Sequence, residues 1–163
     1  MLEMKLDNLD RRILAALQRD GRLSNVQLSE EVGLSPSPCL RRVRLLEQRG
    51  IIRGYRAELD RAGVGLGLTV FVGIKVGQHD DEADSAFRGA VADLPEVVSC
   101  YLLSGESDFL LQVVVPDLPA YERFLRGTLL KLPGVTDIRS NFAISTVKRE
   151  TGLSLAHLPG AAG

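Results

Sequence analysis

The chain has 163 residues, 45% of them hydrophobic and 25% charged, which is ordinary for a globular protein. That length suits one medium domain or two small ones. Because no run of about 18 apolar residues occurs, a membrane span is excluded. The N-terminus is charged from its first turn and lacks an apolar signal stretch, so we expect a cytoplasmic protein. Cys39 and Cys100 lack CxxC spacing, so we expect buried, reduced thiols and neither a disulfide nor a metal site.

The net charge of −1 conceals an uneven distribution. Residues 1–60 hold 11 Lys and Arg against 9 Asp and Glu, whereas residues 61–163 hold 9 against 12. Within residues 35–56, Glu47 is the single acid among six arginines, at positions 41, 42, 44, 49, 53 and 56. A local basic patch on a near-neutral chain indicates a site for a polyanion.

Three helices are predicted before residue 50. Apolar spacing gives an amphipathic helix over residues 6–17 that stops near residues 20–21. Ser24 and Gln27 fit a capping box for a short second helix, which ends at Gly33. A third helix follows over about residues 36–48, and the segment IIRGYRAEL then predicts a short strand or hairpin.

The third helix begins with two prolines. We expect Ser35 to cap it, with Pro36 at the first helical position and Pro38 at the third. The amides of the first turn have no intrahelical acceptor, so both prolines are compatible with a helix.

Projected at about 100° per residue, this helix has two chemically opposite faces. Cys39, Val43 and Leu46 form an apolar face, and Ser37, Arg41, Arg44 and Gln48 form a polar stripe opposite. A short helix, a glycine turn and a helix with an exposed basic face make a helix-turn-helix, whose second helix enters the DNA major groove. The alternative is a small helical domain whose arginines are merely solvated.

The chain after residue 60 has a different pattern. A glycine-rich hinge (61–67) precedes a strand (68–76), a helix (80–94), two strands (97–104 and 109–115), a helix (118–132) and a long last strand (135–148). This β-α-β-β-α-β order predicts a ferredoxin-like domain, so the fold class is α+β. Two helices cover one sheet face, and apolar residues on the other face predict a partner subunit there.

The segments LDRRILAALQRDGRLSN, LSEEVGLSPSPCLRRVRLLEQRGIIRGY, LLSGESDFLL, VVVPDLPAYERFL and LPGVTDIRS occur in this order, and together they resemble the Lrp/AsnC family of transcriptional regulators. The resemblance covers about residues 5–155 and is strongest to the leucine-responsive branch. It implies a winged helix-turn-helix domain (1–60), the hinge (61–67), a ferredoxin-like effector-binding and oligomerisation domain (68–155) and a tail (156–163). It also implies homodimers that assemble further, commonly to octamers, and that bind double-stranded DNA under the control of an amino acid, leucine or another apolar one.

The resemblance also names candidate site residues. For DNA contact these are Ser35, Ser37, Pro38, Arg41, Arg42 and Arg44. Arg41 and Arg44 suit base or groove contact, whereas Arg42, on the flank, suits phosphate. For each arginine alone, pairing with Glu47 or simple solvation remains open.

The family's effector pocket lies between dimers, around the loop that joins the middle strands. The corresponding residues are Leu102, Gly105, Ser107, Asp108, Leu118, Asn141, Phe142 and Ala143. Glycine permits a tight turn here, and a carboxylate can hold an effector's ammonium group. The chain departs from the family at Ser107, where an aromatic residue is usual, and at Asn141, where the leucine-responsive branch has tyrosine. The alternative is that residues 105–108 form only a hairpin turn, with Asp108 satisfying backbone amides.

These features of the sequence could serve three different functions. The first is a DNA-binding regulator that responds to an amino acid. The second is an enzyme or an amino-acid-sensing subunit of one, which we do not expect because no nucleophile–base pair, metal cluster or phosphate loop occurs. The third is a DNA-organising protein of the same fold that has lost sensing through the changes at Ser107 and Asn141.

Overall fold

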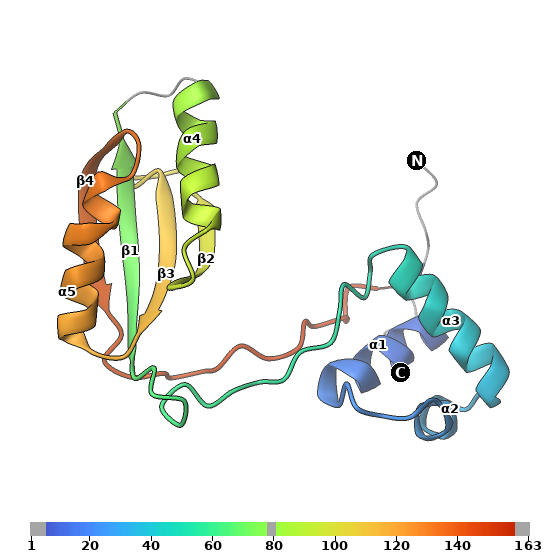
Figure 1. Ribbon diagram of the computed structural model, residues 1–163. Helices are drawn as coiled ribbons and strands as arrows, with labels where there is room; N and C mark the ends of the chain where they lie inside the picture. Colours follow the sequence, from blue (N-terminus) through green and yellow to red (C-terminus); the bar gives the residue numbers. More distant parts are fainter. Residues whose placement is uncertain (1–5, 78–80, 159–163) are drawn as a thin grey trace. The chain divides into compact units, whose positions relative to one another are not determined.

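The computed structural model describes residues 6–77 and 81–158 (Figure 1). The chain divides into two compact units: Met1–Glu58 together with Lys148–Gly163, and Leu59–Val147. None of the helices in the described ranges has the length and apolar character that crossing a bilayer requires.

The first unit contains the three predicted helices: α1 (Asn8–Arg19), α2 (Asn25–Val32) and α3 (Pro36–Gln48). The capping box predicted for α2 is confirmed, since the Gln27 amide donates to Ser24 Oγ at 3.2 Å and the Ser24 amide donates to Gln27 Oε1 at 2.9 Å. A second box, between Asp7 and Asp10, starts α1 and was not predicted. Two reciprocal caps therefore fix where these helices begin.

One small core holds the three helices together. Its fully or nearly fully buried members are Ile13, Leu14, Ala16, Leu28, Val32, Cys39 and Leu46. Cys39 is a free, buried thiol, as predicted. The buried hydroxyl of Ser29 donates to the Val26 carbonyl at 2.7 Å, which removes the cost of burying it unpaired.

The segment after α3 differs from its prediction. Residues 51–59, all of them described, form neither a strand nor a hairpin. Instead, the amides of Ile51 and Ile52 donate hydrogen bonds to the Leu46 carbonyl at 3.0 and 3.2 Å and so cap the end of α3. An amide used as a helix cap is not available to a sheet ladder.

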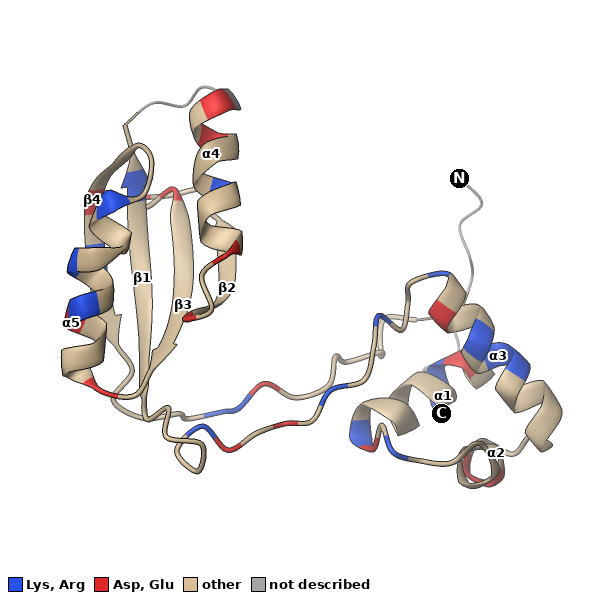
Figure 2. Cartoon of the chain, viewed as in Figure 1, with Lys and Arg blue, Asp and Glu red and all other residues tan. Residues whose placement is uncertain are grey.

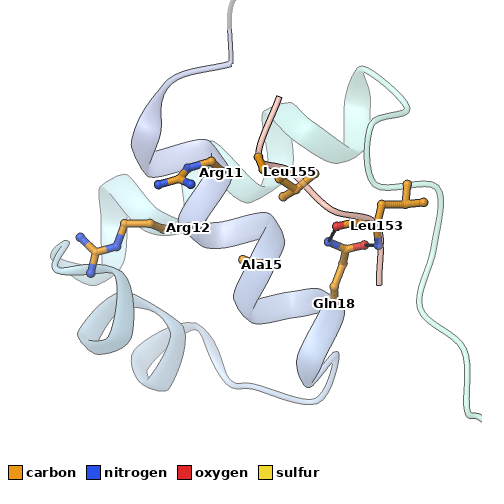
Figure 3. A pocket seen from close by; sticks show the side chains of 7 residues that line it. Arg11, Arg12, Ala15, Gln18, Leu153 and Leu155 are labelled. Carbon is orange, nitrogen blue, oxygen red and sulfur yellow. Dashed lines mark hydrogen bonds between the residues drawn. The ribbon is translucent and has the colours of Figure 1, made fainter. Parts of the chain in front are cut away.

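The C-terminal segment packs with the helices. The predicted effector-binding domain runs to residue 155 with a tail from 156, and in the structure the described residues 148–158 group with the helical unit. Gln18 on α1 donates to the Leu153 carbonyl at 3.1 Å and accepts from the Leu153 amide at 2.6 Å (Figure 3). Leu155 packs against the helical core. Residues 159–163 lie outside the described range.

The second unit has the predicted β-α-β-β-α-β order. Its elements are β1 (Leu68–Val76), α4 (Asp81–Ala92), β2 (Val97–Leu102), β3 (Phe109–Val115), α5 (Leu118–Gly127), a 3-10 turn η1 (Leu129–Lys131) and β4 (Val135–Phe142). The strands form one sheet in the order β2-β3-β1-β4, with antiparallel neighbours throughout. This topology confirms the ferredoxin-like prediction. Several ends were wrong: α4 ends at Ala92 rather than at 94, β2 at Leu102 rather than at 104 and β4 at Phe142 rather than at 148, and the predicted helix 118–132 breaks into α5 and η1.

The two helices cover one face of the sheet (Figure 1). Phe87 and Val91 of α4 and Tyr121 and Phe124 of α5 are buried together with alternate residues of β1 and β3. Phe71 is 39% exposed and alternates with buried neighbours, which places it on the other face, here called the open face. A partner subunit over the open face stays a prediction.

Cys100 is exposed, so the prediction of two buried thiols was wrong for this residue. It lies on β2 opposite Leu111, on the same face as the helices. However, β2 is an edge strand, and the core reaches only its first residue, Val97, and not Cys100. A strand's place in the sheet order decides this burial, and local sequence does not carry that information.

Candidate nucleic-acid interface and effector-binding region

The start of α3 is held by the preceding helix. Ser35 is the N-cap residue, with φ −75° and ψ 155°, but its side chain makes no capping hydrogen bond, so this part of the prediction was wrong. Asn25 of α2 instead donates its side-chain amide to the Pro36 carbonyl at 2.8 Å. Gly33 ends α2 in the left-handed conformation at φ +71°, which turns the chain into α3. The prolines at positions 36 and 38 lie in the first turn, as predicted.

The exposed face of α3 carries the predicted polar stripe. Ser37, Arg41 and Arg44 are exposed, whereas Cys39 and Leu46 are buried on the opposite side. Neither Arg41 nor Arg44 makes an ion pair with any residue that the structure describes. Their guanidinium groups are therefore available to an external partner. The alternative that they pair with Glu47 does not describe the structure.

Two apolar side chains border the stripe. Leu40 is 36% exposed and Leu45 is 38% exposed, and the helical projection places one on each side of Arg41 and Arg44. Apolar contacts with thymine methyl groups are part of major-groove recognition. We did not select these leucines as site residues, although the projection itself was the available signal.

Arg42 has a different role from its neighbours. Its guanidinium contacts Asp10 at 2.7 Å and Asp7 at 2.8 Å and is only 27% exposed. The hydrogen bond that the Arg42 guanidinium donates to Asp10 contributes most to raising the pKa of Arg42. Although partial burial raises the pKa of Asp7, hydrogen bonds from the Asp10 amide and from Arg42 bring it below its usual value. Arg42 therefore ties α3 to the start of α1, which speaks against its predicted phosphate contact.

The β2–β3 loop, residues 105–108, uses its carboxylates internally. Asp108 Oδ2 accepts from the Val76 amide at 2.9 Å, and the Asp108 amide donates to the Ile74 carbonyl at 2.9 Å. This is the backbone-satisfying role that we left open as the alternative. Glu106 forms an ion pair with Arg139 of β4.

The loop lies against the open face at Gly73. A Cβ at residue 73 would stand 2.6 Å from Ser107 Oγ, so any side chain at this position of β1 would require Ser107 to move. Gly105 has no such requirement, because its φ is not positive and a Cβ there would meet open space. The predicted need for glycine at 105 was therefore wrong, and the sterically restricted glycine is Gly73.

The predicted effector residues fall at two ends of the sheet. Ser107 and Asp108 lie beside the end of β1 that contains Ile74, and Leu102 pairs with Phe109 at that same end. Phe142 pairs with Val70 near the opposite end. Leu118 follows β3 at this opposite end too. One protomer therefore does not bring the whole set together.

The second group is partly exposed. Leu118 is 59% exposed and Phe142 is 45% exposed. Asn141 donates its side-chain amide to the Phe71 carbonyl at 3.4 Å, and the Ala143 amide donates to the Thr69 carbonyl at 3.0 Å. Leu102, in the first group, is 61% exposed. Exposed apolar side chains in both groups suit a pocket that a second subunit completes.

Two cavities in the described structure are lined by other residues. One, of about 330 Å³, lies between α1 and the C-terminal segment, and its lining includes Arg11, Arg12, Gln18, Leu153 and Leu155 (Figure 3). The other, of about 280 Å³, lies beside β4, and its lining includes Leu125, Leu130 and Asp137. No group of three or more His, Cys, Asp or Glu side chains suited to a metal occurs within the described ranges.

Known protein families match both parts of the chain. Residues 6–53 match the family model for a winged helix-turn-helix DNA-binding domain, and residues 69–153 match the model for the Lrp/AsnC ligand binding domain. The leucine-responsive regulatory proteins of Salmonella typhimurium and Escherichia coli K12 are each 47% identical over 148 residues, which span 91% of this chain and 90% of theirs.

Solved structures agree with these matches. A transcriptional regulator from Neisseria meningitidis, solved as a complex with L-methionine, is 45% identical with a TM-score of 0.89, and the match covers 94% of this chain and 99% of that one. An AsnC family transcriptional regulator from Agrobacterium tumefaciens is 42% identical with a TM-score of 0.87, over 92% and 97% of the two chains. With both domains matched in order and across nearly all of its length, the chain belongs to the Lrp/AsnC family of transcriptional regulators, which join a DNA-binding helix-turn-helix to a ligand-binding domain.

Proposed function

We propose that this regulator reads DNA through the exposed face of α3 and that an apolar amino acid controls its DNA binding or its assembly. The observation that carries the first part is the stripe of Ser37, Arg41 and Arg44, which is exposed and has no internal ion pair among the described residues. Arginine can donate two hydrogen bonds to guanine in the major groove, and serine can contact several bases.

Within this interface the residues have distinct roles. Arg41 and Arg44 contact bases, Ser37 contacts bases or phosphate, and Ser35 and Pro38 lie at the helix start beside the DNA strand. Because proline has no amide proton, the contact of Pro38 is apolar. Arg42 supports the interface from inside through Asp7 and Asp10. Because the target is DNA, the protein acts in the cytoplasm.

The effector part rests on the ligand-binding domain and on the exposed leucine and phenylalanine side chains at both ends of the sheet. Two copies of the chain, joined over the open face and assembled further toward an octamer, bring the Ser107–Asp108 end of one sheet near the Leu118–Phe142 end of another. The solved complex of the Neisseria relative with L-methionine supports an amino acid with an apolar side chain. Glu106 of the β2–β3 loop and its ion-pair partner Arg139 of β4 offer opposite charges that the ammonium and carboxylate groups of an amino acid can bind.

The test uses the full chain and the DNA upstream of its own gene. Binding is measured by fluorescence anisotropy, first alone and then with each of the twenty amino acids, while analytical ultracentrifugation follows assembly size. We expect specific binding that is strongly salt-dependent, and a change in affinity or assembly with one or a few apolar amino acids.

One observation favours a second candidate function. Asp108 already accepts from the Val76 amide and Glu106 already pairs with Arg139, so the carboxylates of the loop are satisfied without an effector. Loop carboxylates with partners inside the chain are what we expect of a DNA-organising protein that senses no amino acid. DNA binding and assembly size that are indifferent to every amino acid would support that function and contradict effector control. Absence of binding to any upstream DNA would contradict both.

A further inference from the structure

The chain leaving α3 is held firmly against the end of that helix. The amides of Ile51 and Ile52 donate to the Leu46 carbonyl at 3.0 and 3.2 Å. The Tyr55 hydroxyl donates to Glu47 Oε1 at 3.0 Å. Three hydrogen bonds within five residues fix an extended segment that has no secondary structure of its own.

Packing strengthens this attachment. Ile52 is half-buried against the helical core, and a Cβ at Gly21 would stand 3.3 Å from the Tyr55 ring. Partial burial, together with the hydrogen bond to Glu47, raises the pKa of Tyr55 to about 12, so the phenol keeps its proton at neutral pH. Ile52 and Tyr55 therefore hold the segment by packing as well as by hydrogen bonds.

The attachment point lies next to the DNA-reading stripe. Glu47 follows Arg44 by three residues, so the two side chains are neighbours on the surface of α3. Tyr55 meets Glu47 on this flank and not on the buried face of Cys39 and Leu46. The segment thus leaves α3 along the border of the stripe.

Two cations on this segment have no internal role. Arg53 and Arg56 are exposed, and neither makes an ion pair with any residue that the structure describes. By contrast, five other arginines do form such pairs: Arg19, Arg42, Arg88, Arg126 and Arg139. Figure 2 shows basic residues continuing from α3 into the chain that leaves it. The acid nearest to this pair toward the C-terminus is Glu58.

We propose that residues 51–56, here called the arginine arm, form a second DNA contact in which Arg53 and Arg56 bind backbone phosphates beside the groove that α3 enters. The inference rests on the proposed function of α3 and extends it to a surface without a helix or a wing. Phosphate is the expected partner, because about half to two-thirds of protein–DNA hydrogen bonds go to the phosphate and sugar backbone, and exposed arginines beside a groove that α3 enters suit such contacts. An acidic protein would offer the same charge, but the continuity of the arm with the stripe favours DNA.

The test is the salt dependence of DNA binding. For the full chain and the double variant Arg53→Gln/Arg56→Gln, the association constant is measured at several salt concentrations on the upstream DNA and on a scrambled duplex. Each phosphate contact contributes about 0.9 to the slope of log K against log salt, so we expect the slope of the variant to be smaller by about 1.8 for each subunit whose arm contacts the DNA. The ratio of specific to scrambled affinity should stay within about twofold, since phosphate contacts do not read sequence.

A matched control separates local contact from overall charge. The double variant Arg123→Gln/Arg126→Gln removes the same two charges from exposed positions of α5 in the other unit. It should leave the slope unchanged. An unchanged slope in the arm variant, or an equal decrease of the slope in both variants, would contradict the proposal that the arginine arm contacts DNA. In that case the proposed role of α3 would stand as long as wild type binds specifically, whereas a wild type that bound no upstream DNA would overturn both.

Discussion

At the scale of single residues, the neighbours in space decide what each candidate does. Three arginines of α3 look alike in the sequence, yet Arg41 and Arg44 are exposed without an internal ion pair, and Arg42 is held by two carboxylates of α1. In the β2–β3 loop, Gly105 is free to carry a side chain while Gly73, 32 positions earlier, is not.

The contact between Gly73 and Ser107 gives a prediction for the effector loop. The variant Gly73→Ala should destabilise the protein by about 1 kcal/mol, because its Cβ would stand 2.6 Å from Ser107 Oγ and force the Ser107 side chain out of its present position. Urea unfolding of the full chain measures this. Ser107→Ala removes the oxygen that collides, so the double variant should recover most of the loss, and Gly105→Ala should be neutral. Additive effects in the double variant would show that the two residues do not touch.

At the scale of elements, local sequence predicted the helices and strands well but not all of their ends. The α2 capping box, both prolines in the first turn of α3, and the bounds of β1 and β3 follow from patterns within a few residues. The hairpin predicted at 51–59 and the extension of β4 to 148 failed for one reason. Strand formation needs a pairing partner, and these segments instead bond to α3 or leave the sheet.

The link between α3 and α1 gives a prediction at this scale. Arg42→Met should lower the free energy of unfolding at neutral pH by about 1–3 kcal/mol, between the values for exposed and buried ion pairs. Because the folded state holds the pKa of Asp7 below 3.8, this carboxylate contributes stability above pH 3.8 that is lost as the pH falls through the folded value. The difference between variant and wild type should therefore shrink below pH 3.8.

The neighbouring arginine provides the control. Arg41→Met, on the exposed stripe, should change the free energy of unfolding by no more than about 0.5 kcal/mol. A difference between Arg42→Met and wild type that stayed constant from pH 7 to pH 3 would contradict the role of Asp7 in this contact.

At the scale of the whole molecule, the chain crosses between its two units twice. It leaves the helical unit near Glu58 and returns at Lys148, so the helical unit is built from both ends of the sequence. The sequence offered no sign of this return, because Gln18 and Leu153 are 135 positions apart and their hydrogen bonds leave no local pattern. In the proposed effector pocket a second subunit supplies one of the two groups of effector residues, and the sequence of one chain carries no sign of such an arrangement.

The returning segment gives a prediction for the stability of the helical unit. Leu155→Ala should lower the free energy of unfolding by about 2 kcal/mol, the low end of the range for a leucine in a core, because Leu155 is only partly buried. Leu153, two positions earlier, is 77% exposed and attaches through its backbone, so Leu153→Ala should cost little. Chemical denaturation followed by circular dichroism measures both. Equal small losses would mean that the C-terminal segment does not support the helical core.

The central claim is that the exposed face of α3 reads the DNA sequence, and base-specific binding tests it most directly. Affinities of wild type, Arg41→Gln, Arg44→Gln and the control Arg123→Gln are measured on the upstream site and on a scrambled duplex at one salt concentration. We predict that each α3 variant loses about 1–3 kcal/mol on the specific site and much less on the scrambled duplex, so that specificity falls, while the control matches wild type. Equal losses on both duplexes, or no loss at all, would contradict the claim.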